Sequence, residues 1–179
     1  MLLLYIFLIV LLFSSVPYVV LLAKRSGAAA EIRNALNRSG CEFRGHGIWY
    51  MGGIEGRRAD FHVLRGNRVI AVKVIGFLSA GTAVHLESPT EYRIKKLKPS
   101  ETDSPISTYK KQKKHPYDFK SGLPSEWSGL PMAKVILVMD PYPAKLTRPT
   151  PSGETKLRVG DDTGEGELYD TISFIGLFN

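Results

Sequence analysis

The first 23 residues contain no charged side chain, and this uncharged segment constrains the fold more than any other feature of the sequence. Twenty of these 23 residues are apolar, and the exceptions are Ser14, Ser15 and Pro17. As a helix, the 22 residues from Leu2 to Ala23 would be about 33 Å long, which matches the roughly 30 Å hydrocarbon core of a bilayer. The sequence therefore predicts a transmembrane anchor over residues 1–23.

A cleaved signal peptide is the alternative interpretation of this segment. No basic residue precedes the apolar run, and Lys24 and Arg25 separate it from the small-residue sequence Ala28-Ala29-Ala30. Signal peptides have a basic start and a shorter apolar run, so these features favour an uncleaved anchor. Because Lys24 and Arg25 hold their flank inside, we expect a single-pass membrane protein whose C-terminal domain, residues 24–179, lies in the cytoplasm.

The composition of the remaining chain is that of a soluble domain. Residues 24–179 carry all 24 basic and all 17 acidic side chains, which excludes a protein with several membrane spans. Cys41 is the one cysteine in the chain. An internal disulfide framework and a cysteine-based zinc site are therefore excluded, and a lone reduced thiol agrees with a cytoplasmic location.

Positive charge is concentrated in the first two thirds of the domain. Residues 24–90 and 91–120 each have a net charge of +5, whereas residues 151–179 have a net charge of −4. The run Lys110-Lys111-Gln112-Lys113-Lys114 lies within residues 98–131, which we expect to form a flexible basic insertion. The basic segments are suited to nucleic acid or to anionic lipid headgroups, and both interpretations stay open.

The pattern of apolar and turn residues predicts an α/β domain. Two helices are expected, one over Ser26–Arg38, ended by Ser39-Gly40, and one that starts in the capping box Ser88-Pro89-Thr90-Glu91 and runs to Leu97. A strand over Cys41–Tyr50 precedes a glycine-rich bend at residues 52–56, Lys134–Asp140 forms a buried strand, and Leu157–Gly160 and Leu168–Phe178 complete the sheet.

Two further strands, Arg58–Arg65 and Arg68–Ile75, flank the two-residue loop Gly66-Asn67 and predict a tight hairpin. Since opposed residues share a face of a sheet, this register places Asp60 opposite Lys73, with His62 one step along on the same face. The structural interpretation is a cross-strand ion pair, worth about 0.2–1 kcal/mol if it is exposed.

With Asp60 in Ala59-Asp60-Phe61 and Lys73 in Ala71-Val72-Lys73 on successive strands, residues 26–140 resemble the PD-(D/E)xK nuclease superfamily. The resemblance implies an αβββαβ restriction-endonuclease-like core with a mixed sheet. It also implies that Asp60 and Lys73 are catalytic, with Asp60 as a ligand of Mg²⁺ or Mn²⁺, and Glu31 lies where some relatives carry a further glutamate. His62, opposite Ala71, is the candidate for the missing metal ligand, although its nitrogen suits transition metals better. Members of the superfamily include membrane-anchored bacterial proteins. The position of the family's glutamate is Ala71 in this chain.

Three functions follow from these features. Because Ala71 cannot ligate a cation, the leading hypothesis is a membrane-anchored, catalytically degenerate nuclease-like domain that binds nucleic acid or a protein partner. An active metal-dependent endonuclease that uses Asp60, Lys73 and Glu31 is the second hypothesis. A non-enzymatic scaffold associated with the membrane is the third.

Overall fold

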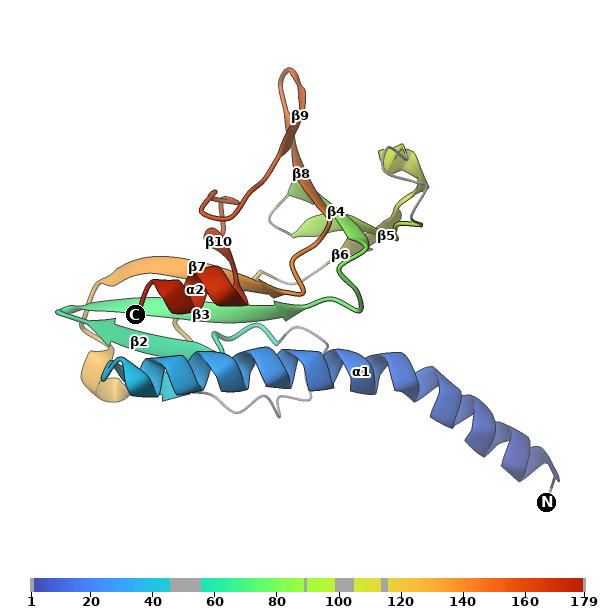
Figure 1. Ribbon diagram of the computed structural model, residues 1–179, viewed down its shortest axis with the longest axis horizontal. Coiled ribbons are helices and arrows are strands. Elements are labelled where there is room, and N and C mark those ends of the chain that lie inside the picture. Colours follow the sequence, from blue (N-terminus) through green and yellow to red (C-terminus); the bar gives the residue numbers. More distant parts are fainter. Residues whose placement is uncertain (1, 46–55, 89, 99–104, 114–115, 179) are drawn as a thin grey trace.

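The computed structural model describes residues 2–45, 56–88, 90–98, 105–113 and 116–178, and its strands form two mixed sheets (Figure 1). The strand order is β1-β2-β3-β7-β10 in the first sheet and β6-β5-β4-β8-β9 in the second. The elements are α1 (Leu2–Arg38), β1 (Glu42–Gly45), β2 (Phe61–Arg65), β3 (Arg68–Gly76), β4 (Thr82–Ser88), β5 (Glu91–Lys96), the 3₁₀ helix η1 (Ile106–Thr108), β6 (Lys110–Lys113), the 3₁₀ helix η2 (Ser125–Trp127), β7 (Met132–Asp140), β8 (Lys145–Thr150), β9 (Gly153–Lys156), β10 (Glu167–Asp170) and α2 (Thr171–Gly176).

The predicted anchor and the predicted helix over Ser26–Arg38 are one continuous helix, α1. Ser26 therefore lies inside a helix and does not cap one, because most residues on both sides of it favour the helical state and bridge the weak formers Ser26 and Gly27. The end of the helix agrees with the prediction, since α1 ends at Arg38 and Gly40, two residues later, adopts a φ of +69°. From Leu4 onward this helix is long and apolar enough to cross a membrane.

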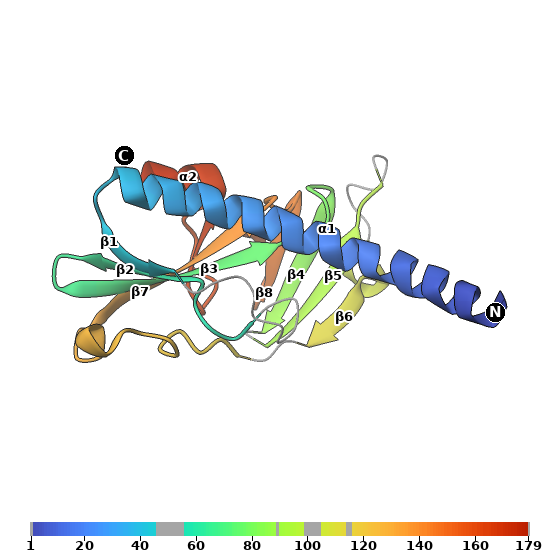
Figure 2. The same cartoon turned by 90° about the horizontal axis from the view of Figure 1, so that it is seen from below.

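The two halves of α1 have different surroundings. Large apolar side chains from Leu4 to Val20 are exposed, whereas burial against the rest of the protein begins at Leu21. In Figures 1 and 2 the N-terminal half of α1 extends away from the domain and the C-terminal half lies along the first sheet. One helix is thus both the membrane-spanning candidate and a core element of the domain.

The first sheet lies between the helices and the second sheet. One face packs against α1 and α2 through a core that includes Ile32, Leu36, Phe61, Val72 and Phe174. The opposite face packs against the second sheet through a core that includes Ile75, Val84, Leu137, Leu146 and Leu168. Because β3 and β7 are covered on both faces, they have the nearly continuous apolar sequences that were expected for Arg68–Ile75 and Lys134–Asp140.

The helix expected after the capping box, up to Leu97, is wrong. Residues Glu91–Lys96 form strand β5, which pairs with β4 in antiparallel register. Tyr92 and Ile94 pack on the core between the sheets, and the residues that alternate with them are charged. This period of two, combined with a partner strand, outweighs the local helix-start signal.

Residues 98–131 contain more structure than a flexible insertion would have. Within the described part of this segment, Lys110–Lys113 forms β6 at the edge of the second sheet. Tyr109 and Trp127 are buried, with 5% and 3% of their surface exposed. The expectation that this segment does not pack is therefore wrong for these residues, because two aromatic side chains fix it to the domain.

The ends of the domain are only partly as expected. Strand β1 covers the first part of the predicted strand Cys41–Tyr50, and residues 46–55, which include most of the glycine-rich bend, lie outside the described residues. The last predicted strand, Leu168–Phe178, divides into β10, which is parallel to β7, and helix α2. The Asp170 side chain ends the strand and starts the helix, because it accepts a hydrogen bond from the Ser173 amide at 2.6 Å.

Candidate functional site

The β2–β3 hairpin has the register that the sequence predicts. Arg65 pairs with Arg68 across the loop, and the pairing continues to Phe61 and Val72. Gly66 takes a φ of +62° at the first loop position, where type II′ turns place glycine. Asp60 directly precedes β2, and its amide donates to the carbonyl of Val72 at 2.8 Å. Asp60 and Lys73 therefore meet at the end of the hairpin, as expected.

The carboxylate of Asp60 is bound on both oxygens. Its Oδ1 pairs with Nη2 of Arg25 on α1 at 2.5 Å, and its Oδ2 accepts a hydrogen bond from the Val74 amide at 2.8 Å. Lys73 Nζ lies 3.5 Å from the same Oδ2. Exposed surface is only 6% for Arg25, 6% for Asp60 and 1% for Lys73. We call these three residues the buried charge cluster.

Among the described residues, two cations of this cluster contact the same carboxylate, and further groups also contact Lys73. Lys73 donates a hydrogen bond to the carbonyl of Arg58 at 2.8 Å, and its Nζ lies 5.7 Å from the centre of the Tyr117 ring. A carbonyl dipole and an aromatic face both favour an ammonium group. The cluster joins α1 to the sheet, and it contains the expected cross-strand pair of Asp60 and Lys73 in a buried position.

Arg25 is a member of this cluster that was not predicted from the sequence. Arg25 appears in the sequence as part of the basic flank of the anchor, 35 positions before Asp60. Its contact with Asp60 depends on how α1 packs on the sheet. The only local signal is that Arg25 lies four residues after Leu21 and three before Ala28, on the buried side of the helix.

His62 shares the sheet face of Lys73 but makes a different contact. It is fully buried, and its Nε2 lies 2.8 Å from the carbonyl oxygen of Phe119. Because a carbonyl only accepts, Nε2 carries the hydrogen and donates it. Burial lowers the pKa of His62 below 6.5, and the hydrogen bond to Phe119 opposes this only in part. His62 is thus a neutral core histidine that fixes residue 119 to the hairpin.

Acidification should destabilise the domain through His62. The unfolded state binds a proton more readily than the folded state, so this contribution to stability is complete above pH 6.5 and is lost as the pH falls toward the lower folded pKa. We expect His62→Gln to flatten the dependence of the free energy of unfolding between about pH 7.5 and about pH 5.5, measured with urea. Burial lowers the pKa of His85 as well, so the double variant with His85→Gln should be flatter still. An unchanged slope in His62→Gln would contradict the assignment.

The residues present do not fit a Mg²⁺ or Mn²⁺ ion. Glu31 is exposed on α1, whereas Asp60 is buried and already bound by Arg25 and the Val74 amide. His62 Nε2 is used by Phe119. Among the described residues there is no group of three or more His, Cys, Asp or Glu side chains that could hold a metal. Two neighbouring cations also disfavour a divalent ion at Asp60.

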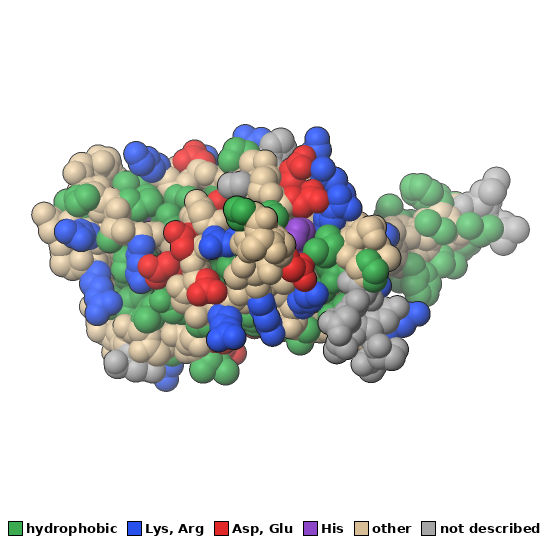
Figure 3. Space-filling view, turned by 90° about the horizontal axis from the view of Figure 1, so that it is seen from above, with side chains coloured by type: hydrophobic (Ala, Val, Ile, Leu, Met, Phe, Trp, Pro, Cys, Tyr) green, Lys and Arg blue, Asp and Glu red, His purple; other side chains and the backbone are tan. Residues whose placement is uncertain are grey.

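The basic run at Lys110–Lys113 is largely neutralised by its own sheet. Lys111 Nζ lies 3.4 Å from Glu87 and 3.0 Å from Glu91, and Lys113 Nζ lies 3.6 Å from Glu91. The pKa values of Glu87 and Glu91 are both lowered. The main cause is a hydrogen bond from Arg93 for Glu87 and a hydrogen bond from Lys111 for Glu91. Figure 3 shows acidic and basic side chains close to one another on the face of the domain that is seen from above. An extended basic patch suited to a phosphate backbone is not formed by these described residues.

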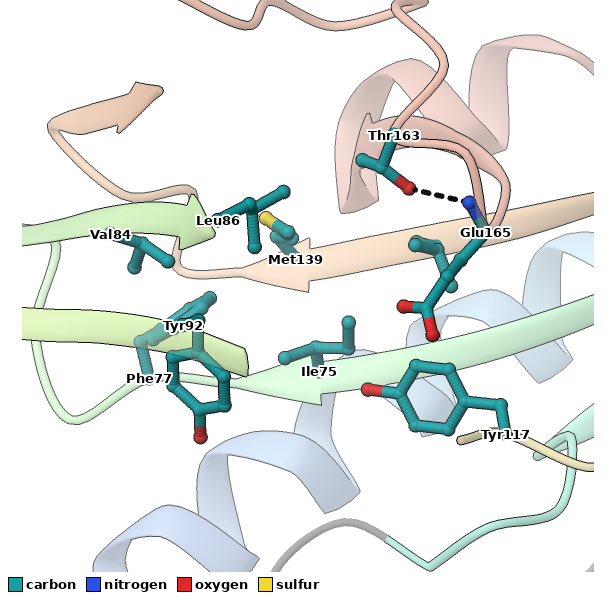
Figure 4. Close-up of a pocket in the computed structure, with 10 residues that line it drawn as sticks. Ile75, Phe77, Val84, Leu86, Tyr92, Tyr117, Met139, Thr163 and Glu165 are labelled. Atoms are coloured by element: carbon teal, nitrogen blue, oxygen red, sulfur yellow. Dashed lines mark hydrogen bonds between the residues drawn. The ribbon is translucent and has the colours of Figure 1, made fainter. Parts of the chain in front are cut away.

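A small pocket opens between the two sheets (Figure 4). Its lining consists of Ile75, Phe77, Val84, Leu86, Leu137 and Met139, with polar atoms from Tyr92, Tyr117, Thr163 and Glu165. The cavity volume of about 30 Å³ is room for one or two water molecules.

The fold and the site together define a mixed-sheet α/β domain attached to a long apolar helix, with a buried charge cluster at their junction. Comparison with family models, with curated proteins and with solved structures finds no match to this chain.

Proposed function

We propose that this chain is a membrane-anchored, non-catalytic interaction domain. The observation that carries the proposal is the binding of Asp60, the one carboxylate in the expected catalytic pair, between Arg25 and the Val74 amide. A catalytic carboxylate must reach a metal or a water, whereas this one joins α1 to the sheet. The residues at the expected catalytic positions therefore stabilise the fold. We place the function of the protein on the surface of the domain.

The resemblance to the PD-(D/E)xK superfamily is part of this proposal. The antiparallel order β1-β2-β3, with β7 parallel to β3, supports a nuclease-like core. The segment between β3 and β7 departs from it, because its described residues form strands and 3₁₀ helices where the resemblance implies an α-helix. A degenerate descendant of such a core accounts for both the hairpin and the altered site.

Plasmid nicking tests the absence of catalysis. We expect full-length protein in detergent micelles to leave supercoiled DNA intact with Mg²⁺ or Mn²⁺, since Asp60 and His62 are already bound within the protein. Asp60→Asn and Lys73→Ala serve as the matched variants. Mn²⁺-dependent nicking that both variants lose would establish the active endonuclease and overturn our proposal.

Of the two kinds of partner that the domain could bind, nucleic acid has less support than a protein. On β6, the pairing of Lys111 and Lys113 with Glu87 and Glu91 leaves fewer cations that could release counterions from DNA. Retention on a DNA column that falls steeply with salt would favour nucleic acid, and no retention at low salt would favour a protein partner. The contacts on β5 and β6 favour the protein partner.

Burial of the helix supports an uncleaved anchor. Leu21, Arg25, Ala28 and Ala29 are all buried in the domain. Cleavage after Ala30 would remove these contacts and leave Asp60 and Lys73 without Arg25. A signal peptide is dispensable to the mature fold, whereas this segment completes it.

A reporter fused after Asn179 should give a cytoplasmic signal. Lys24 and Arg25 follow the apolar segment directly and act on topology during insertion, before Arg25 is buried. The measurement is the activity of a reporter that works on only one side of the membrane, with an N-terminal fusion as the control for the opposite side. A C-terminal signal from outside the cytoplasm would contradict the proposed orientation.

A further inference from the structure

The domain carries a second group of basic residues, close to the point where α1 leaves it. Lys24 Nζ donates a hydrogen bond to the carbonyl of Leu78 at 2.8 Å, which holds the turn between β3 and β4 against α1. Gly76 lies close to Leu21 at the start of the same turn, since a Cβ on it would be 3.2 Å from Leu21 Cδ1. The turn therefore sits where the exposed apolar half of the helix ends.

The end of β5 lies beside this turn. The Leu97 amide donates to the carbonyl of Gly81 at 2.7 Å, and Lys96 pairs with Thr82 at the start of β4. Lys96 and Lys98 are exposed. In Figures 1 and 2, β4 and β5 lie on the side of the domain from which the N-terminal half of α1 emerges. We call Lys24, Leu78, Lys96 and Lys98 the helix-exit surface.

The helix-exit surface combines exposed positive charge with an exposed apolar side chain. Leu78 is 52% exposed, although its neighbour Phe77 is buried. Within the described residues neither Lys96 nor Lys98 forms an ion pair with a carboxylate, in contrast to Lys111. An apolar tip flanked by lysines beside a membrane-spanning helix matches the headgroup layer of a bilayer.

We propose that the helix-exit surface binds the anionic phospholipid headgroups around the anchor, with Leu78 inserted at the boundary of the acyl chains. This inference rests on the proposed membrane anchorage and adds a defined orientation of the domain on the bilayer. The lysines near the membrane are attracted by the negative potential of anionic lipids, which decays within a Debye length. The domain then contacts the membrane at two places, α1 and the turn between β3 and β4. These two contacts fix the orientation of the domain on the bilayer.

The test places a fluorophore at the turn in the full chain. Leu78→Cys is labelled in a Cys41→Ser background and reconstituted in nanodiscs of phosphatidylcholine, with or without phosphatidylserine, that carry brominated acyl chains. We expect stronger quenching with phosphatidylserine. Changing Lys96→Glu together with Lys98→Glu should reduce the quenching to the level in phosphatidylcholine alone.

A matched control separates local contact from net charge. Arg65→Glu with Arg68→Glu makes the same change of charge at the exposed β2–β3 loop, at the far end of the domain, and should leave the quenching unchanged. A label at Ile172, which is 83% exposed on α2, should show little quenching in any nanodisc. Equal quenching at residue 78 in both lipids and in both charge variants would overturn the inference.

Two further outcomes also distinguish the possible failures. Loss of DNA retention in the Lys96/Lys98 variant, with no effect of phosphatidylserine on the label, would assign these lysines to nucleic acid and overturn the lipid contact. If alkaline carbonate releases the full chain from vesicles, then the anchor itself fails, and both the proposed function and this inference are wrong. Retention of the chain with no lipid dependence at residue 78 refutes the inference alone.

Discussion

Replacing Asp60 by Ala is expected to lower the free energy of unfolding by about 3–5 kcal/mol, because two buried cations then lose their shared anion. Arg25 and Lys73 would stay in a region that is almost closed to water. The Val74 amide would also lose its acceptor. The measurement is urea unfolding of the full chain in micelles, and Asp60→Asn provides a milder variant that keeps an acceptor for Val74.

The controls for this prediction separate buried from exposed charge. Glu126 pairs with Arg44 at 3.4 Å on the surface, so Glu126→Ala should change stability little. Replacing the whole cluster, with Arg25→Met, Asp60→Leu and Lys73→Met, should cost less than Asp60→Ala alone, because no charge is then buried without a partner. If the triple variant is less stable than Asp60→Ala, then the electrostatic attraction among the three charged groups contributes net stability to the fold.

Replacing Phe174 by Ala should lower the free energy of unfolding by about 3–5 kcal/mol, the range for deleting a buried aromatic side chain. Phe174 has no exposed surface and lies in the core between α1, α2 and the first sheet. Its ring also stacks at a tilt on Phe178, with 5.1 Å between the ring centres. The same urea unfolding experiment measures the loss.

Ile172 provides the matched control two residues away on the same short helix. Its side chain is 83% exposed, so Ile172→Ala should leave stability nearly unchanged. If both substitutions have equal effects, then α2 is not packed on the sheet as described. A large effect at Phe174 alone supports the three-layer core.

The parts of the fold that could be predicted from sequence are those set by local patterns. Because the loop Gly66-Asn67 has two residues, Arg65 must pair with Arg68, and every later pair of the hairpin follows from this one. A slip of one residue would place Lys73 on the face of Phe61 and Val63. The strand at Lys134–Asp140 followed from its unbroken apolar run. The contact between Asp60 and Lys73 was therefore predictable, and it is confirmed at 3.5 Å.

The errors concern features that depend on distant partners. The capping box at Ser88 indicates a helix, but pairing with β4 makes Glu91–Lys96 a strand. Residues 98–131 are too polar to fold alone, yet Tyr109 and Trp127 are buried in the folded domain. The sequence of the segment itself does not indicate these distant partners. The role of Arg25 depends on the angle at which α1 crosses the sheet, which no local spacing encodes.

The position of α1 in the core also determines when the domain can fold during synthesis. Its sheet-facing side chains, such as Ile32 and Leu36, share a core with Phe174, which is made 138 residues after Leu36. At a ribosomal rate of 5–20 residues per second, this delay is about 7–28 s. In the proposed membrane-anchored protein, the N-terminal half of the helix enters the bilayer before the last helix emerges from the ribosome. Folding of the anchored protein would then be completed on a tethered chain. Until Phe174 is made, the sheet-facing side chains of α1 lack part of their core and are exposed to proteases at the membrane surface.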